Sequence, residues 1–134
     1  MHLTLAPGVL EEVVKHARAC YPREGCGLIA GRAGLAERFI PMSNALGSST
    51  AYEMDPGQLV AALRSMREAG EDLAAIYHSH PSSGPLPSTR DTERAHYPEA
   101  AYLIVSLERP DSPAVQAFRI VDGRVDALEL RAIV

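Results

Sequence analysis

Residues 73–91, LAAIYHSHPSSGPLPSTRD, set the strongest limits on how this chain can fold. The apolar run at 73–79 is typical of a central strand, and the prolines and glycine that follow restrict a loop over 80–87. In the segment STRD an acid follows a serine by three residues, which fits a capping box and predicts a short helix beginning after Ser88. The chain therefore has to bury one strand and then fold back near the end of that strand.

Apolar residues at helical spacing predict two further helices. The first covers about 8–20 and ends before Pro22. The second has Asp55 as its N-cap and Pro56 as its first helical residue, and it ends at Gly70. Short apolar or alternating runs predict strands at 26–31, 35–42, 101–107, 114–121 and 124–130.

This order of helices and mostly antiparallel strands predicts an α+β sandwich around one sheet. The chain has 134 residues, with neither a linker nor an internal repeat. We therefore expect a single domain over 1–134.

Composition excludes several classes of partner. A net charge of −4 provides no electrostatic footprint for nucleic acid. The N-terminal stretch has no basic region followed by an apolar core, so we expect neither a signal peptide nor a membrane span. The two cysteines, Cys20 and Cys26, are too few for a disulfide scaffold and suit a reducing cytosol. We therefore expect a cytoplasmic protein.

Two histidines and an aspartate within 78–91 have the chemistry of a zinc site. His78 and His80 share one face of a strand, with Cα atoms roughly 6–7 Å apart. The proline-rich loop can bring Asp91 back beside them. Two imidazoles and one carboxylate leave the fourth position of a tetrahedral zinc open for water, which is typical of a catalytic rather than a structural site.

Each of these residues also has an ordinary structural explanation. A lone buried histidine is most often a hydrogen-bonded core residue, an acid in a first helical turn complements the helix dipole, and Ser88 is often only a cap. The combination of His-x-His on an apolar strand with an acid in register favours metal. No His-Glu-x-x-His, no His-x-Glu with paired cysteines and no Gly-x-Ser-x-Gly occurs in the chain.

The segment HSHPSSGPLPSTRD resembles the signature of the JAMM (MPN+) metalloproteases, His-x-His-Pro followed by Pro-Ser-x-x-Asp, with ten residues between the second histidine and the aspartate. REGCGLIAG at 23–31 resembles the glutamate-bearing strand of that family, and YEMDPGQL at 52–59 resembles the entry into its second helix. The resemblance implies the JAMM/MPN fold, a cytidine deaminase-like α+β fold with a mostly antiparallel curved sheet flanked by helices. The short chain is similar to the compact prokaryotic members.

The resemblance also implies roles for five residues. His78, His80 and Asp91 would bind one Zn²⁺ ion, with a water as fourth ligand whose pKa falls to about 7. The residues alone leave the general base open among several acids, which are Glu11, Glu12, Glu24, Glu37 and Glu53. The family pattern points to Glu24 as general acid/base. Ser88 resembles the family serine that hydrogen-bonds the developing oxyanion.

The reaction implied is hydrolysis of the amide or isopeptide bond after the C-terminal Gly-Gly of a ubiquitin-like or sulfur-carrier protein. Release of cysteine or a peptide from the carrier and removal of the carrier from target lysines both fit this reaction. The alternatives are a non-enzymatic scaffold of the same fold and a zinc hydrolase of small amides. Iron or manganese also accepts such ligands, although zinc suits them best. No heptad seam favours either a monomer or a homodimer.

Overall fold

A computed structural model describes residues 1–134 and contains seven strands and three helices. The predicted elements are all present, and most of their ends differ by only one or two residues. Their order is β1 (His2–Leu5), α1 (Val9–Cys20), β2 (Cys26–Arg32), β3 (Leu35–Met42), α2 (Pro56–Ala69), β4 (Asp72–His80), α3 (Thr89–Glu93), β5 (Ala101–Ser106), β6 (Ala114–Val121) and β7 (Arg124–Ala132).

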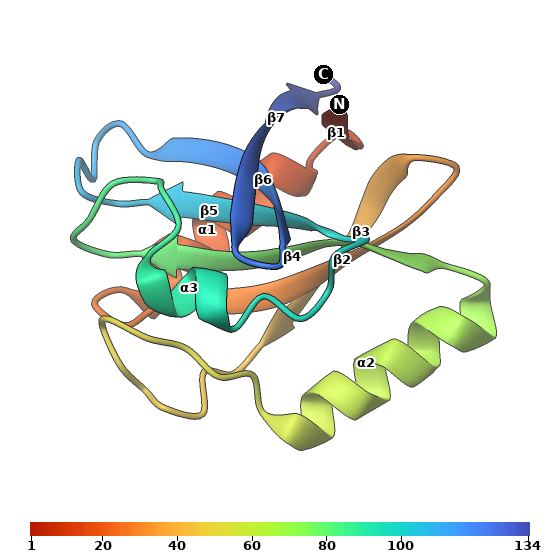
Figure 1. The fold of residues 1–134 in the computed structure, drawn as a ribbon, viewed down its shortest axis with the longest axis horizontal. Helices are drawn as coiled ribbons and strands as arrows, with labels where there is room; N and C mark the ends of the chain where they lie inside the picture. Colours follow the sequence, from red (N-terminus) through yellow and green to blue (C-terminus); the bar gives the residue numbers. More distant parts are fainter.

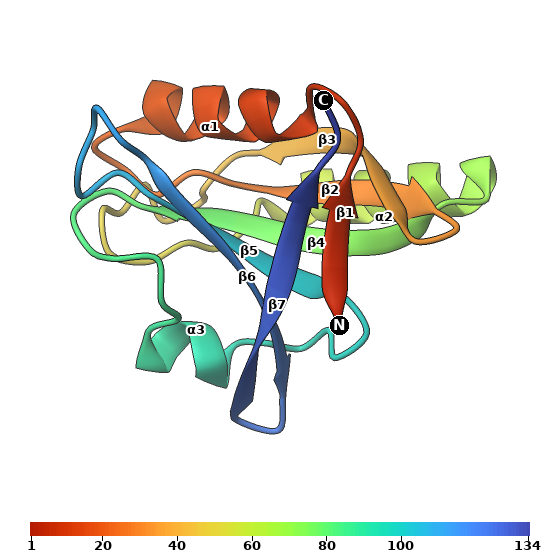
Figure 2. The same ribbon diagram turned by 90° about the horizontal axis from the view of Figure 1, so that it is seen from above.

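The strands form one closed barrel in the order β1-β3-β2-β4-β5-β6-β7. Antiparallel pairs predominate, as predicted, but β1 is parallel to both β3 and β7, and β4 is parallel to β5. Figures 1 and 2 show β1 and β7 side by side, and because the two strands are parallel, the N-terminus and the C-terminus lie at opposite ends of the pair (Figure 2). The sheet is therefore curved, mixed and closed.

Strand β1 is the element that the sequence analysis did not predict. Its four residues, HLTL, precede Pro7 and Gly8 and carry too little pattern to stand out alone. Leu3 and Leu5 are buried because β1 fills the gap between β3 and β7. Only the long-range pairing makes this segment a strand.

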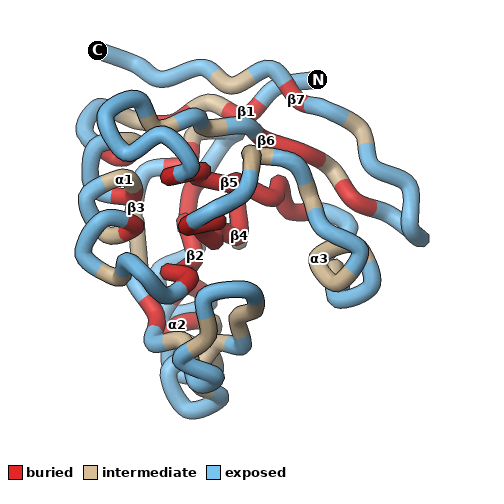
Figure 3. The backbone as a smooth tube through the Cα atoms, turned by 90° about the vertical axis from the view of Figure 1, so that its left-hand side faces the viewer, coloured by how far each residue is buried: buried red, intermediate tan, exposed pale blue.

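Two helices cover opposite faces of the central strands and create two apolar clusters. Helix α1 packs with one cluster, which includes Val13, Ile29 and Tyr77. Helix α2 packs with the other, which includes Leu28, Met66 and Ile76. Because successive side chains alternate across a strand, β2 and β4 contribute to both clusters and read as continuous apolar runs. In Figure 3 the buried residues concentrate along β2, β4 and β5.

No helix has both the length and the apolar content required to span a bilayer. The short helix α3 lies beside the C-terminal end of β4, after the loop 81–88 (Figure 1). This arrangement places the predicted polar residues at the buried C-terminal end of β4.

Candidate metal centre

The C-terminal end of β4 carries both histidines on the face that packs toward α2. His78 lies opposite Cys26 of β2 and Ile104 of β5, and the pairing with β5 continues to His80. His78 and His80 are 1% and 4% exposed. Pro81 then ends the strand because it has no N–H for the ladder. Both imidazoles are therefore fixed by the central part of the barrel.

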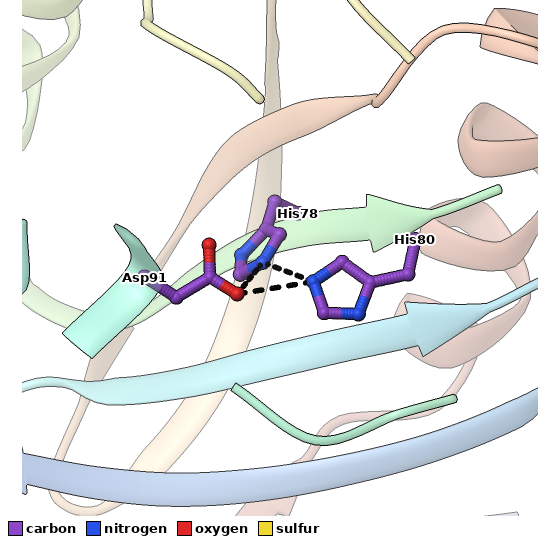
Figure 4. Close-up of side chains that lie close together, drawn as sticks. All are labelled: His78, His80 and Asp91. Atoms are coloured by element: carbon purple, nitrogen blue, oxygen red, sulfur yellow. Dashed lines mark hydrogen bonds and ion pairs between the residues drawn. The ribbon is translucent and has the colours of Figure 1, made fainter. Parts of the chain in front are cut away.

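Asp91 reaches the histidines from the first turn of α3, as the capping box predicted. Ser88 Oγ accepts a hydrogen bond from Asp91 N at 3.0 Å, and Ser88 N donates to Asp91 Oδ2 at 2.9 Å. The box orients the Asp91 carboxylate toward β4, so that it points at both rings (Figure 4).

Three side-chain atoms converge at one point. His78 Nε2 and His80 Nε2 are 3.1 Å apart, and Asp91 Oδ2 lies 3.1 Å from the first and 3.0 Å from the second. Ligands of a tetrahedral zinc at 2.0–2.1 Å are about 3.3 Å from one another, so this triangle is close to the size that zinc requires. The residues fit the ion that the sequence predicted.

Hydrogen bonding shows that a positive charge belongs in this triangle. His80 Nδ1 donates to the carbonyl oxygen of Gly84 at 2.8 Å, so Nε2 of neutral His80 carries a lone pair. That lone pair faces the carboxylate oxygen of Asp91 at 3.0 Å. Two lone pairs repel at this distance, and either a proton or a metal ion between them removes the repulsion. Fixing one ring nitrogen by a backbone carbonyl is also how proteins orient metal-binding histidines.

Electrostatics at the three residues agree with this arrangement. Burial lowers the pKa of His78 and keeps its ring neutral, as a metal ligand must be. Burial also opposes protonation of His80, but its bonds to Asp91 and Gly84 outweigh burial and raise its pKa. Burial disfavours the Asp91 carboxylate, but the contacts with both histidines and with Ser88 N–H hold its pKa well below the usual range.

Glu24 is the one buried acid among the five candidate bases. It is 4% exposed, while Glu11, Glu12, Glu37 and Glu53 are all exposed. It lies between α1 and β2 and lines a cleft of about 480 Å³ together with His80 and Ser88. The structure therefore brings Glu24, Ser88 and the three ligand side chains to one place.

Burial also changes the acidity of Glu24. It raises the pKa of the carboxyl to about 7. A carboxyl with this pKa accepts and releases protons near neutral pH, which suits a general acid/base. A cation at the histidines lowers that pKa, so the raised value describes the protein without metal.

The raised pKa predicts a loss of stability at alkaline pH in chelator-treated protein. The folded state binds the Glu24 proton more tightly than the unfolded state, so the stabilisation is complete below about pH 4.5 and is lost as pH rises through about 7. Glu24→Gln removes this titration. We expect chelator-treated Glu24→Gln to gain up to about 3 kcal/mol in free energy of unfolding relative to the parental protein at pH 8, and little at pH 5. Urea denaturation at both pH values measures the difference, and equal gains at both would contradict the prediction.

Three contacts near the site were not predicted, because they join distant parts of the chain. Tyr52 stacks on His78 with ring centroids 4.7 Å apart and an interplanar angle of 21°. Asn44 Nδ2 donates to the carbonyl oxygen of Glu24 at 3.1 Å. Ser79 Oγ accepts from the N–H of Gly25 at 2.7 Å. Tyr52 and Ser79 lie within the motifs of 52–59 and 78–91, but the sequence shows nothing of their partners.

A second cavity, of about 280 Å³, lies on the other side of Asp91 and is mainly apolar. It extends between the segment before α2, helix α3 and the barrel. Its wall includes Tyr52, Met54, Leu59, Tyr97 and Tyr102. The ligand triangle is thus flanked by a polar cleft and an apolar cavity.

A closed barrel with a His-His-Asp triangle, a buried glutamate and an adjoining cleft defines a candidate metal-dependent hydrolase. A family profile described as prokaryotic homologs of the JAB domain matches residues 6–121. The chain belongs to this family, which confirms the resemblance to the JAMM/MPN+ proteins that HSHPSSGPLPSTRD indicated.

Two curated relatives cover most of the chain. The CysO-cysteine peptidase of Mycobacterium tuberculosis is 39% identical over 125 residues, which are 92% of this chain and 86% of that protein. The desampylase of Haloferax volcanii is 40% identical over 111 residues, which are 78% of this chain and 80% of that protein.

Solved structures confirm the predicted fold. A solution structure of a protein from Desulfitobacterium hafniense superposes with a TM-score of 0.86 at 34% identity and covers 97% of this chain and 92% of that one. The JAB1/MPN domain protein from Archaeoglobus fulgidus has a TM-score of 0.65 at 16% identity and covers 98% and 97%. At 16% identity, the similarity to the Archaeoglobus fulgidus protein is a similarity of fold only.

Proposed function

We propose that this protein is a zinc-dependent JAMM-type protease that hydrolyses the bond after the C-terminal Gly-Gly of a ubiquitin-like or sulfur-carrier protein. The observation that carries the proposal is the convergence of His78, His80 and Asp91 beside a cleft that also contains Glu24 and Ser88. Two relatives are named for their action on such carriers, as a CysO-cysteine peptidase and a desampylase.

In this proposal His78, His80 and Asp91 are the metal ligands. When bound, zinc supplies Lewis-acid chemistry and lowers the pKa of a water to about 7. Two nitrogens and one carboxylate oxygen suit zinc better than calcium or magnesium, which prefer oxygen ligands only. Of the three ligands His80 lines the cleft, where the substrate carbonyl would lie.

Glu24 is the general acid/base of the proposed reaction. Its carboxylate takes a proton from the attacking water and later delivers it to the leaving nitrogen, either the α-amine of a released residue or the ε-amine of a lysine. The burial of Glu24 and its position in the cleft wall with His80 and Ser88 support this role.

Ser88 is the proposed donor to the developing oxyanion. Its oxygen already accepts from Asp91 N, so its hydroxyl hydrogen remains free to donate into the cleft. We expect Ser88→Ala to lower kcat by about 100- to 1000-fold, the usual cost of one oxyanion donor. Steady-state hydrolysis with circular dichroism as a check on α3 measures this effect. Ser88→Thr keeps both the cap and the hydroxyl and serves as the control. If Ser88→Ala is as active as Ser88→Thr, Ser88 has no role in the mechanism.

The shape of the site suits a glycine-ended tail. Glycine lets the scissile bond approach a metal ion held on a buried strand, because no side chain intervenes. The apolar cavity beside Asp91 would take a bulkier side chain from further along the same tail.

We also propose that residues 1–134 act as a single domain. We place the protein in the cytoplasm, where the free thiols of Cys20 and Cys26 would persist.

The experiment that tests the function uses zinc-loaded protein and a ubiquitin-like sulfur carrier extended after its Gly-Gly. One substrate carries a single cysteine, one carries a short peptide, and one is joined to a lysine ε-amine. Parental protein, Glu24→Ala and a chelator-treated sample run side by side, with products identified by mass spectrometry. We expect cleavage directly after the last glycine, lost in both controls.

The same experiment separates the alternatives. Preference for the cysteine substrate indicates release from the carrier, and preference for the lysine conjugate indicates deconjugation. Cleavage of small amides without cleavage of any carrier would replace the proposal with a small-molecule hydrolase. Absence of any cleavage by zinc-loaded protein would favour a scaffold and reject the proposed function.

A further inference from the structure

The Glu24 carboxylate has no hydrogen-bond partner that would orient it. Glu24 is 4% exposed, and its Oε1 is buried without a partner. The residue also lies outside every helix and strand. Its orientation must therefore come from the backbone of Glu24 and Gly25.

That backbone is fixed on all four of its polar groups. Glu24 N donates to Ser48 O at 2.8 Å, and Glu24 O accepts from Asn44 Nδ2 at 3.1 Å. Gly25 N donates to Ser79 Oγ at 2.7 Å, and Gly25 O accepts from Ser79 N at 3.0 Å. Ser79 thus binds Gly25 twice, once through its side chain and once through its backbone.

Ser79 occupies a special position because it lies between the two histidines. Side chains alternate along β4, so His78 and His80 face the ligand triangle, while Ser79 faces the opposite side and is fully buried. One strand segment of three residues therefore carries both imidazoles and the hydroxyl that holds the backbone next to Glu24.

A second side chain, that of Tyr77, lies on the same face of β4 as Ser79. Its hydroxyl is 3.1 Å from His16 Nδ1 on α1. Tyr77 is fully buried and presses against Gly25, where an added Cβ would lie 2.5 Å from the Tyr77 oxygen. His16 and Tyr77 thus lie against Gly25, whose N–H is bound by Ser79.

We propose that Ser79 is a positioning residue, which sets the distance between the Glu24 carboxylate and the metal triangle through its bond to Gly25 N. The proposal rests on the proposed role of Glu24 as general base. Without the Ser79 oxygen, Gly25 N–H is buried and unpaired, so the peptide shifts to find a partner. A shift of about 1 Å in a catalytic group costs about 100-fold in rate.

The test compares zinc-loaded Ser79→Ala, Ser79→Thr and the parental protein on the carrier extended by cysteine. We expect Ser79→Ala to lower kcat by about 10- to 100-fold, with KM within about twofold and one zinc per chain retained. The Gly25 amide should exchange with solvent at least about tenfold faster, measured by NMR. Ser79→Thr keeps the acceptor and suits a strand, so it should restore both values.

Two further variants separate positioning from stability. Ile120→Val truncates a buried side chain at the end of β6 that lies away from the metal triangle. It should lower the melting temperature while leaving kcat unchanged. Tyr77→Phe removes the hydroxyl that lies against Gly25, and it should lower kcat by a smaller factor with zinc retained. If Ser79→Ala does not fold, the kcat of Tyr77→Phe decides whether the positioning role is kept, and an unchanged kcat rejects it.

The proposal is overturned if Ser79→Ala keeps the parental kcat, loses zinc along with activity, or is not rescued by threonine. If the parental protein cleaves no carrier substrate, the proposed function fails on its own. The positioning claim is then decided by Gly25 exchange alone, because unchanged exchange in Ser79→Ala rejects it and faster exchange rescued by threonine supports it.

Discussion

Glu24→Gln should bind zinc as the parental protein does and lose nearly all turnover. Glutamine has the same shape as glutamate but cannot accept the proton of the attacking water, so kcat should fall by about 100- to 10,000-fold or more. The ligand triangle is made by other residues, so zinc content should stay at one per chain. Metal analysis together with steady-state hydrolysis measures both quantities.

Glu37→Gln is the matched control for this prediction. Glu37 is an exposed acid on β3 that lines neither the cleft nor the apolar cavity, so its loss should leave kcat within about twofold of the parental value. If Glu24→Gln cleaves at the parental rate, another acid is the base and the cleft assignment is wrong.

His78→Ala should lose zinc and activity together. Nε2 of this buried ring is one of three atoms in the triangle, and the two remaining ligands cannot complete a catalytic zinc site. Removing an outer-shell partner costs about 10- to 100-fold in metal affinity, so the loss of a ligand itself should exceed 100-fold. Competition with a zinc-chelating dye measures the affinity.

His2→Ala is the control, because His2 is an exposed histidine on β1. It should keep both zinc and activity. Stoichiometric zinc in His78→Ala at parental affinity would place the metal elsewhere. A folding defect is recognised by comparing the unfolding of His78→Ala with that of chelator-treated parental protein.

The parts of the site that depend on neighbouring residues could be predicted from the sequence. His78 and His80 are two residues apart on a strand, and the capping box from Ser88 to Asp91 determines where the carboxylate points. Local geometry alone therefore indicated the metal site. The helices and six of the seven strands were predictable for the same reason, since their hydrophobic patterns repeat within short windows.

The parts that depend on distant residues could not be predicted in this way. Glu24 is separated from His78 by more than 50 residues, and only the family pattern distinguished it from four other acids. The bond from Gly25 to Ser79 and the stacking of Tyr52 on His78 exist because β2, β4 and the segment before α2 meet in space. Strand β1 was missed because it becomes a strand only where β3 and β7 accept it.

The closure of the barrel by β1 has a consequence for how the protein behaves in solution. Exposed strand edges are templates for pairing with other chains, and a closed barrel removes them. The four residues of β1 pair with the edges of both β3 and β7, so neither edge is free to pair with another chain. Deleting 1–5 would uncover two neighbouring edges next to the buried side chains of α1, and we expect such a protein to aggregate even though the residues of its candidate site are intact.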